Sequence, residues 1–174
     1  GRPSARAPFV AAPKPSLAFL SKPTEQYHVC LSAPGIARFD RRRFTASVLD
    51  SVLGGSASSR LFQEIREQRG LAYAVYTFSS QYADTGQMGV YVGTREENLA
   101  ECLRIVAEQI RQIATDGPGP DELKRAKENL KGRVMLSMEV TSNRMSRLGK
   151  SLITDSELLD LDRILAEIEA VDAD

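Results

Sequence analysis

The chain has 174 residues, of which 42% are apolar and 26% are charged, a balance typical of one globular domain. Its 23 basic and 23 acidic side chains cancel, which argues against a nucleic acid or an anionic membrane surface as a partner. No apolar run approaches the roughly 20 residues that span a bilayer, so we expect a cytoplasmic protein with no membrane partner.

Residues 1–16 are rich in proline and small side chains, which is typical of a linker or an extended leading segment. We assign the rest of the chain, residues 17–174, to a single domain. Two strands are predicted at its start, Leu17–Lys22 and Gln26–Gly35. In the second strand His28 alternates with apolar side chains, so it is expected on the opposite face.

Two helices are predicted after these strands. Asp40 is predicted to cap the first helix, which the glycine pair at 54–55 ends. Ser58 or Ser59 is predicted to cap the second helix, and Gly70 ends it. Both helices carry apolar side chains at three- and four-residue spacing, which indicates one buried face each.

An antiparallel hairpin is predicted in the middle of the chain. Its strands begin at Ala72 and Gln87, and the connection QYADTG joins them. Thr94 and Glu97 form a capping-box pattern at the start of a helix that Gly117 ends. The apolar stripe of that helix is predicted to consist of Leu99, Leu103, Val106, Ile110 and Ile113.

The last third of the chain is predicted to be helical. One helix begins near Pro120, a second is centred on Met145 and Leu148, and the final stretch LLDLDRILAEIEAVDAD is amphipathic. Strands therefore come in pairs and helices in groups, without single alternation. This order predicts an α+β fold, a mainly antiparallel sheet with helices packed on one face.

Few side chains suit a metal ion or a nucleophile. His28 is the only histidine, and Cys30 and Cys102 are the only cysteines. Zinc sites need such ligands held close together, so we expect no metal in this chain. Cys30 lies in a strand-like run and Cys102 on a helical apolar stripe, so both are expected to be buried, reduced thiols; a disulfide is the alternative.

Residues 53–73 read LGGSASSRLFQEIREQRGLAY. This stretch closely resembles the C-terminal half of the pitrilysin/insulinase-type zinc metallopeptidases, in the branch of the mitochondrial processing peptidase and its bacterial relatives. The resemblance runs from roughly Thr24 to the end, through DTGQMGVYVGT, PDELKRAKENLKGRVMLSME, NRMSRLG and IEAVDAD. It implies one of two repeated α+β halves that close like a clamshell around a peptide.

In that family the first half carries an inverted zinc motif, His-x-x-Glu-His, whose glutamate acts as general base. A chain with one histidine cannot contain this motif. The resemblance therefore implies a zinc-free second half that stops before the family's last helix and strand, and that is inactive alone. The implied partners are an N-terminal catalytic half that holds the zinc and an unfolded peptide substrate; a homodimer is left open.

The resemblance also singles out Arg66 and Tyr73 as supporting catalytic residues. In the family, an arginine and a tyrosine at this seven-residue spacing reach from the second half toward the zinc site. A cation and a phenol there can donate hydrogen bonds to a substrate carbonyl and stabilise the developing oxyanion. Taken alone, the residues favour a solvated cation at a helix end and a tyrosine half-buried in a sheet; Arg69 is interpreted as a helix C-terminal cation in either case.

Two functional classes follow from the resemblance. The first is the substrate-binding half of a zinc metalloendopeptidase. The alternative is a non-catalytic peptide-binding or scaffold subunit of the same fold, as in the family's respiratory-complex core subunits. The retained pair of Arg66 and Tyr73 favours the first, and an intact His-x-x-Glu-His motif upstream would distinguish them.

Overall fold

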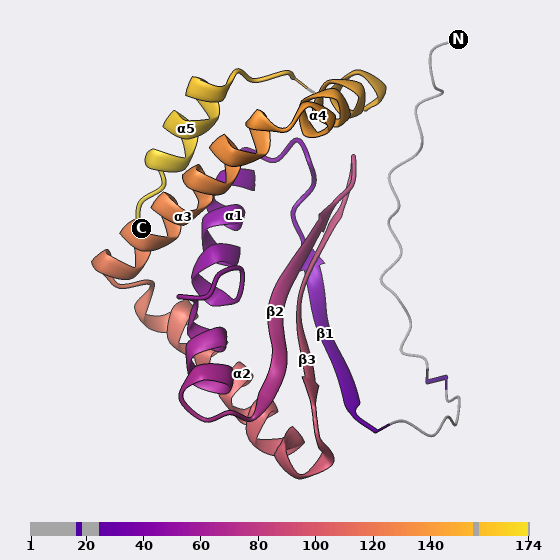
Figure 1. Ribbon diagram of the computed structural model, residues 1–174, viewed down its shortest axis with the longest axis vertical. Helices are drawn as coiled ribbons and strands as arrows, with labels where there is room; N and C mark the ends of the chain where they lie inside the picture. The colour runs from indigo at the N-terminus through magenta and orange to yellow at the C-terminus, as the bar shows by residue number, and fades with distance from the viewer. Residues whose placement is uncertain (1–16, 19–24, 155–156, 174) are drawn as a thin grey trace.

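The computed structural model describes residues 17–18, 25–154 and 157–173, and in these ranges helices cover one face of a three-stranded sheet (Figure 1). The strands are β1 (Tyr27–Gly35), β2 (Ala72–Gln81) and β3 (Gly86–Thr94). The predicted leading segment, residues 1–16, and most of the predicted strand Leu17–Lys22 lie outside the described residues. The predicted α+β class is confirmed.

The helical elements follow the predicted order, with one unexpected type. The element before β2 is a π-helix, η1, whose turns are wider than those of an α-helix. The bounds are α1 (Arg43–Leu53), η1 (Phe62–Glu67), α2 (Glu96–Asp116), α3 (Pro120–Glu139), α4 (Thr141–Ile153) and α5 (Leu161–Glu169). Within the described ranges, no helix combines the length and the apolar character needed to cross a bilayer.

The central strand of the sheet is β3, which pairs antiparallel with β1 on one side and with β2 on the other. The predicted hairpin is therefore confirmed. Val75 lies opposite Val92 and Tyr76 opposite Tyr91. Because successive side chains of a strand point to opposite faces, the valines are buried beneath the helices and the tyrosines lie on the other face.

The main core lies between the sheet and the nearest helical elements. Leu61 and Ile65 have no exposed surface and project from the η1 segment toward the sheet, where they meet Val75, Val90 and Val92. Helix α2 packs against the other side of this cluster. Its contributors are Cys102, Ile105 and Val106, all at most 1% exposed.

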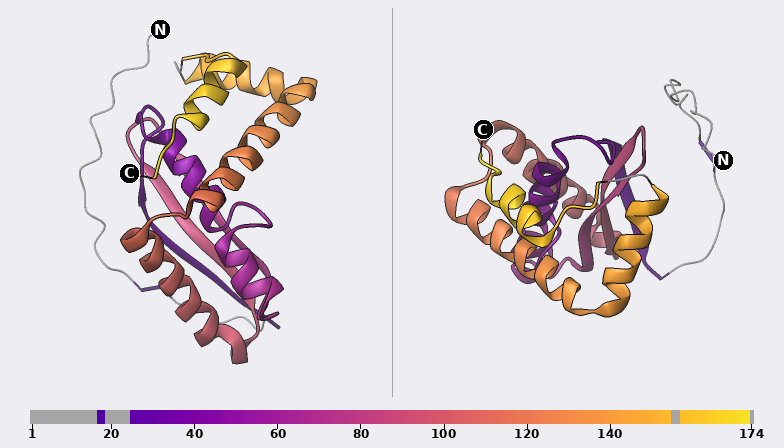
Figure 2. Two further views of the ribbon diagram at one scale, coloured as in Figure 1. Left: turned by 90° about the vertical axis from the view of Figure 1, so that its left-hand side faces the viewer. Right: turned by 90° about the horizontal axis from the view of Figure 1, so that it is seen from above.

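A second helical layer, which the sequence analysis did not predict, lies outside the first. Helix α1 is placed between the sheet and the pair α3 and α5 (Figures 1 and 2). Val48 and Val52 of α1 pack against Ala126 and Leu130 of α3 and Ile168 of α5. Helix α1 therefore has apolar contacts on two sides, whereas α4 buries none of its residues.

The predicted cap at Asp40 is wrong. Helix α1 begins at Arg43, and its first turn receives no side-chain cap. The Asp40 carboxylate instead accepts hydrogen bonds from Arg42, at 2.8 Å from the backbone nitrogen and 2.7 Å from Nη2. Side-chain hydrogen bonding by Arg42 lowers the pKa of Asp40 to about 2. The neighbouring arginine thus competes successfully for the carboxylate that sequence reasoning gave to the helix.

The predicted caps of the next two helices are also wrong. The Ser59 hydroxyl donates to the Ser56 carbonyl at 2.6 Å, and η1 has no side-chain cap. The Thr94 hydroxyl donates to the Leu71 carbonyl at 2.6 Å, because Thr94 is still part of β3 when α2 begins at Glu96. These hydroxyls stabilise the connections between elements.

The apolar stripe of α2 is rotated from the predicted one. The buried positions are Cys102, Ile105, Val106 and Gln109, whereas Ile110 is 45% exposed. The reason is local: Ile110 lines an open apolar hollow beside β1 that no described element fills. The predicted helix ends are correct, since Gly117 ends α2 with a φ of 71° and Pro120 begins α3.

A half-buried ion pair connects the start of η1 to the start of α3. Arg60 contacts Glu122 in two places, Nε to Oε1 at 2.6 Å and Nη2 to Oε2 at 2.7 Å, and also donates to the Gly117 carbonyl at 3.2 Å. Burial acts to raise the pKa of the Glu122 carboxyl, but the hydrogen bonds and charge of Arg60 outweigh it and hold this pKa below its usual value.

Replacing Ile65 by Ala should destabilise the domain by about 2–5 kcal/mol, because the side chain fills the centre of the core and leaves a cavity. Ile110→Ala is the matched control, since the same deletion at a half-exposed position should cost about 1 kcal/mol or less. Urea unfolding of both variants measures the difference. Equal losses at the two positions would contradict the location of the core.

Glu122→Gln should make the free energy of unfolding depend less on pH between pH 6 and pH 3. A lowered folded-state pKa means that the ionised carboxylate contributes stability above its unfolded pKa, and that this contribution disappears as pH falls through the folded pKa. The wild-type chain should therefore lose more unfolding free energy between pH 6 and pH 3 than Glu122→Gln, by on the order of 1 kcal/mol. Glu128→Gln, an exposed change on the same helix, should keep the wild-type slope.

Candidate functional site

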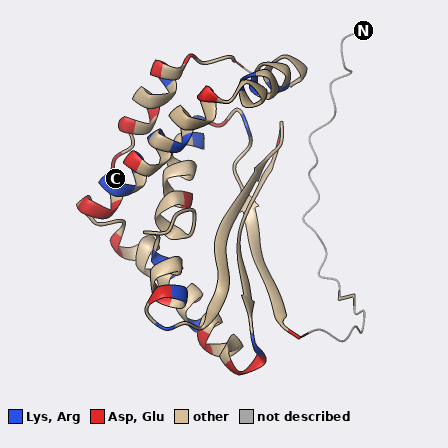
Figure 3. Cartoon of the chain, in the orientation of Figure 1, with Lys and Arg blue, Asp and Glu red and all other residues tan. Residues whose placement is uncertain are grey.

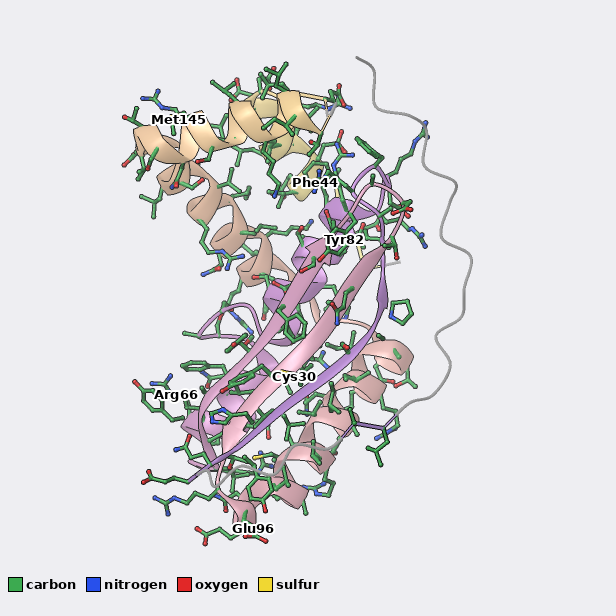
Figure 4. The ribbon with its side chains drawn as sticks, turned by 90° about the vertical axis from the view of Figure 1, so that its right-hand side faces the viewer. Cys30, Phe44, Arg66, Tyr82, Glu96 and Met145 are labelled. Atoms are coloured by element: carbon green, nitrogen blue, oxygen red, sulfur yellow. The ribbon has the colours of Figure 1, made fainter. Side chains whose placement is uncertain are left out.

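The position of Arg66 is set by the π-helix. In η1 the Gln68 N–H donates to the Gln63 carbonyl five residues earlier, at 2.9 Å. Ile65 is anchored in the core, so the next residue, Arg66, emerges at the rim of the sheet (Figure 4). Single turns of π-helix are rare and are often found at functional sites.

A fixed turn carries the chain from η1 into β2. Gly70 has a φ of 60°, in the left-handed region that glycine adopts without strain. The following carbonyl, that of Leu71, accepts hydrogen bonds from Thr94 Oγ1 at 2.6 Å and Asn98 Nδ2 at 3.1 Å. The connection between Arg66 and Tyr73 is therefore held from the β3–α2 side and has little freedom.

A β-bulge turns Tyr73 outward. The register of β2 against β3 shifts between Ala72 and Ala74, so that Tyr73 has no partner in the ladder. Bulges next to functional sites commonly redirect a side chain in this way. Tyr73 is 79% exposed, which contradicts the alternative interpretation of a tyrosine half-buried in the sheet.

The structure brings Arg66 and Tyr73 into direct contact. The Arg66 guanidinium carbon lies 4.7 Å from the centre of the Tyr73 ring and 4.8 Å from that of Phe62. A guanidinium between two aromatic rings is attracted to both faces and loses orientational freedom. Arg66 also has a long ion pair with Glu67 at 3.7 Å, which leaves most of its N–H donors available. We find no hydrogen bond to the Tyr73 hydroxyl from the described residues.

A hollow of about 360 Å³ lies beside this pair. Its lining combines both side chains with Gly70, Thr94 and Asn98, and Leu71 and Ala72 add apolar surface. The guanidinium and the phenol are hydrogen-bond donors. Together they can hold a carbonyl oxygen or a developing negative charge on it, which is the chemistry expected of them.

The open face of the sheet adjoins this site. The three strands contain no Asp, Glu, Lys or Arg, and Figure 3 shows the sheet uncharged against helices that carry both signs. On this face the Tyr76 and Tyr91 rings stack at 4.7 Å, and His28 Nδ1 lies 2.7 Å from the Tyr91 hydroxyl. The prediction that His28 lies opposite the apolar face is correct, and the surface is neutral and aromatic.

Arg69 stays apart from this site. It forms an ion pair with Glu64 and also donates to the Glu64 carbonyl, at 3.0 Å. Its contacts therefore satisfy the C-terminal end of the helix, as predicted from its position next to Gly70.

The cysteines and carboxylates of the described ranges offer no metal site. No group of three or more His, Cys, Asp or Glu side chains is placed to hold a metal ion in these parts of the chain. Cys102 is buried, and burial raises the pKa of its thiol. Cys30 is exposed, which corrects its predicted burial: it points to the open face, on the same side of the sheet as His28.

Sequence reasoning missed the residues that support the pair. Phe62 precedes Arg66 by four positions, a spacing that places two side chains on one face of a helix, so its contact could have been suspected. The roles of Thr94 and Asn98 carry no such signal, because they depend on a hydrogen bond to Leu71, more than twenty residues away.

The sequence comparisons give consistent matches. Residues 2–130 match the family model described as the peptidase M16 inactive domain. An uncharacterized zinc protease of Streptomyces coelicolor is 44% identical over 155 residues, 89% of this chain and 34% of that protein. An uncharacterized zinc protease of Bacillus subtilis is 42% identical over 150 residues, 86% of this chain and 37% of that protein.

The comparisons with solved structures agree with the sequence matches. The crystal structure of a peptidase M16 inactive domain from Pseudomonas fluorescens aligns with a TM-score of 0.77 at 27% identity, over 87% of this chain and 36% of that one. A chain of complex III from Candida albicans aligns with a TM-score of 0.76 at 14% identity, which shows the fold alone. The present chain spans about a third of the length of the curated relatives named above.

The isolated chain should not retain stoichiometric zinc, because its single histidine has no ligand cluster around it in the described residues. Elemental analysis after chelator treatment, zinc re-addition and desalting measures the bound metal. One zinc per chain, lost on His28→Ala, would contradict the prediction.

Proposed function

The chain belongs to the peptidase M16 inactive-domain family, and from this we propose that it is the substrate-binding, zinc-free half of a zinc metalloendopeptidase. The observation that carries the proposal is the contact between Arg66 and Tyr73. An exposed phenol and a guanidinium are held together by a π-helix, a glycine turn and a β-bulge. A merely solvated cation and tyrosine would not need three local departures from regular structure.

The proposed partner is an N-terminal half that holds the zinc and closes over the open face of this sheet. The described residues of this chain do not fit a zinc ion, so metal chemistry would come from the partner half. Relatives named as zinc proteases that are about two and a half times as long as this chain support a two-part arrangement.

The proposed substrate is an unfolded peptide that lies against the open face. An extended peptide presents alternating side chains and carbonyl groups, and a neutral, aromatic surface accepts both without burying an unpaired charge. The stacked Tyr76 and Tyr91 would form the floor of this channel. Arg66 and Tyr73 would then meet the peptide at one end of the sheet.

Within the proposed reaction, Arg66 and Tyr73 would orient the substrate and stabilise charge. Both would donate hydrogen bonds to the carbonyl oxygen of the bond that is cleaved, and these bonds would strengthen as negative charge develops on that oxygen. The stack on Phe62 would keep the guanidinium plane aimed at the oxygen. Neither residue would exchange a proton with the substrate.

In a longer protein that includes the zinc-bearing half, Tyr73→Phe should lower kcat/KM by about 100-fold, the range observed when one oxyanion donor is lost. Stability should change little, because the hydroxyl is exposed. Tyr82→Phe, at another exposed tyrosine in the hairpin turn, is the matched control and should keep wild-type kcat/KM. Peptide hydrolysis and melting temperature are measured together.

Arg66→Ala should act in the same direction, and the double variant should lose less than the product of the two single losses, because both groups serve one transition state. Wild-type kcat/KM in folded Tyr73→Phe would overturn the catalytic role of that residue. Full peptide binding with no hydrolysis in wild type would favour the alternative, a non-catalytic peptide-binding or scaffold subunit.

A further inference from the structure

A second cavity, far from Arg66 and Tyr73, is lined by positive charge. It has a volume of about 630 Å³ and lies between the end of β2, the start of α1 and helix α4. We call it the basic pocket and define it by Arg38, Arg43, Arg147 and Lys150. The rings of Phe39 and Phe44 also line it.

The four cations have no carboxylate partner among the described residues. Arg38 Nη2 donates to the Gln81 carbonyl at 3.0 Å, and Arg147 donates to the Leu159 carbonyl. The Arg43 guanidinium carbon lies 4.8 Å from the centre of the Phe44 ring. Lys150 has no side-chain contact of this kind within the described ranges. Glu157 is the only carboxylate among the described residues that line the cavity.

Several arginines elsewhere on the described surface are paired with carboxylates, unlike these four cations. Arg60 contacts Glu122, and Arg104 contacts both Glu101 and Glu108. In a chain whose formal charge is zero, an excess of positive charge among the described residues that line one cavity raises the free energy through like-charge repulsion. A bound anion would relieve it.

The position of the basic pocket indicates which kind of anion would bind there. Arg66 and Tyr73 lie where β2 begins, and Gln81, whose carbonyl Arg38 holds, lies where it ends. Figure 4 shows Arg66 near one end of the sheet, and Phe44 and Tyr82 near the other. Eight residues of extended chain span about 26 Å at ~3.3 Å each, so a peptide along the sheet would reach both.

We propose that the basic pocket binds an Asp or Glu side chain of the peptide substrate, about eight residues from the bond that meets Arg66 and Tyr73. The inference rests on the proposed function and adds a preference to it. Guanidinium groups bind carboxylates through paired hydrogen bonds, and the rings of Phe39 and Phe44 accept the aliphatic part of the side chain. The neutral strands between the two positions would impose no charge preference of their own.

The test compares two twelve-residue peptides that differ only at one end, where one has two Glu and the other two Gln. Each carries the same uncharged dye, and fluorescence anisotropy with the 174-residue chain gives its Kd. The Kd of the Glu peptide should be at least about fivefold lower than that of the Gln peptide. A fivefold ratio corresponds to the upper end of the free energy contributed by one exposed ion pair. Salt should reduce this difference, because it screens exposed charges.

Two variants locate the effect. Lys150→Gln removes an exposed charge that holds no other described group, so the fold should be unaffected, and most of the preference for Glu should be lost. Arg38→Gln should reduce it further. Arg111→Gln, an exposed change of the same charge on α2, is the matched control and should leave the preference unchanged.

The outcomes separate this inference from the proposed function. Equal binding of both peptides overturns the inference and leaves the proposed function standing. Binding of neither at millimolar concentration overturns both. A preference for Glu that persists in Lys150→Gln and Arg38→Gln shows that the anion binds elsewhere, and inorganic phosphate bound as tightly as the Glu peptide shows a general anion site; either result overturns the inference.

Discussion

The packing of Leu61 and Ile65 against the inner face of the sheet is the contact on which the rest of the molecule depends. These two side chains fix the η1 segment against the sheet, and with it the direction in which Arg66 leaves the chain. They also leave the opposite face of the sheet without a helical cover, since the described helices lie on the inner side (Figure 1). A buried core and an exposed site are therefore set by the same few contacts.

The one-sided arrangement explains why the strands carry no charged side chains. An exposed sheet face that only met water would tolerate lysine and glutamate, which exposed strands often carry. Instead Gly89 lies beneath the Phe78 ring, whose Cζ atom would be 2.4 Å from an added Cβ, and Tyr76 stacks on Tyr91. Aromatic rings that lie flat over small residues make a smooth surface, and such a surface suits contact with another chain.

The sequence was sufficient for the order of elements from β1 onward, the hairpin and the helix ends at glycine, because each depends on local periodicity or on backbone conformation. The sequence was insufficient where several groups compete for the same hydrogen-bonding side chain. Arg42 takes the carboxylate of Asp40 from the predicted cap, and the hydroxyl of Thr94 bonds to Leu71 in a distant loop. The second helical layer was missed because the two-sided contact of α1 depends on where α3 and α5 return. The pairing of Arg66 with Tyr73 was suggested by family resemblance, whereas their contact needs the bulge, which has no sequence signal.

The distribution of charge along the open face has a consequence for selectivity. As the floor of the proposed channel, a neutral aromatic surface would bind extended peptides through shape and apolar contact, and it would discriminate weakly between sequences because every peptide has an apolar part. In the proposed channel, discrimination would then come from the ends of the floor, where cations lie: Arg66 at the start of β2, and the basic pocket beyond its end. Electrostatic contacts at two separated points fix the register of an extended chain better than either alone, because the strand spacing between them sets the length that satisfies both. The length of β2 would therefore set the distance between the two contact points in the proposed substrate channel.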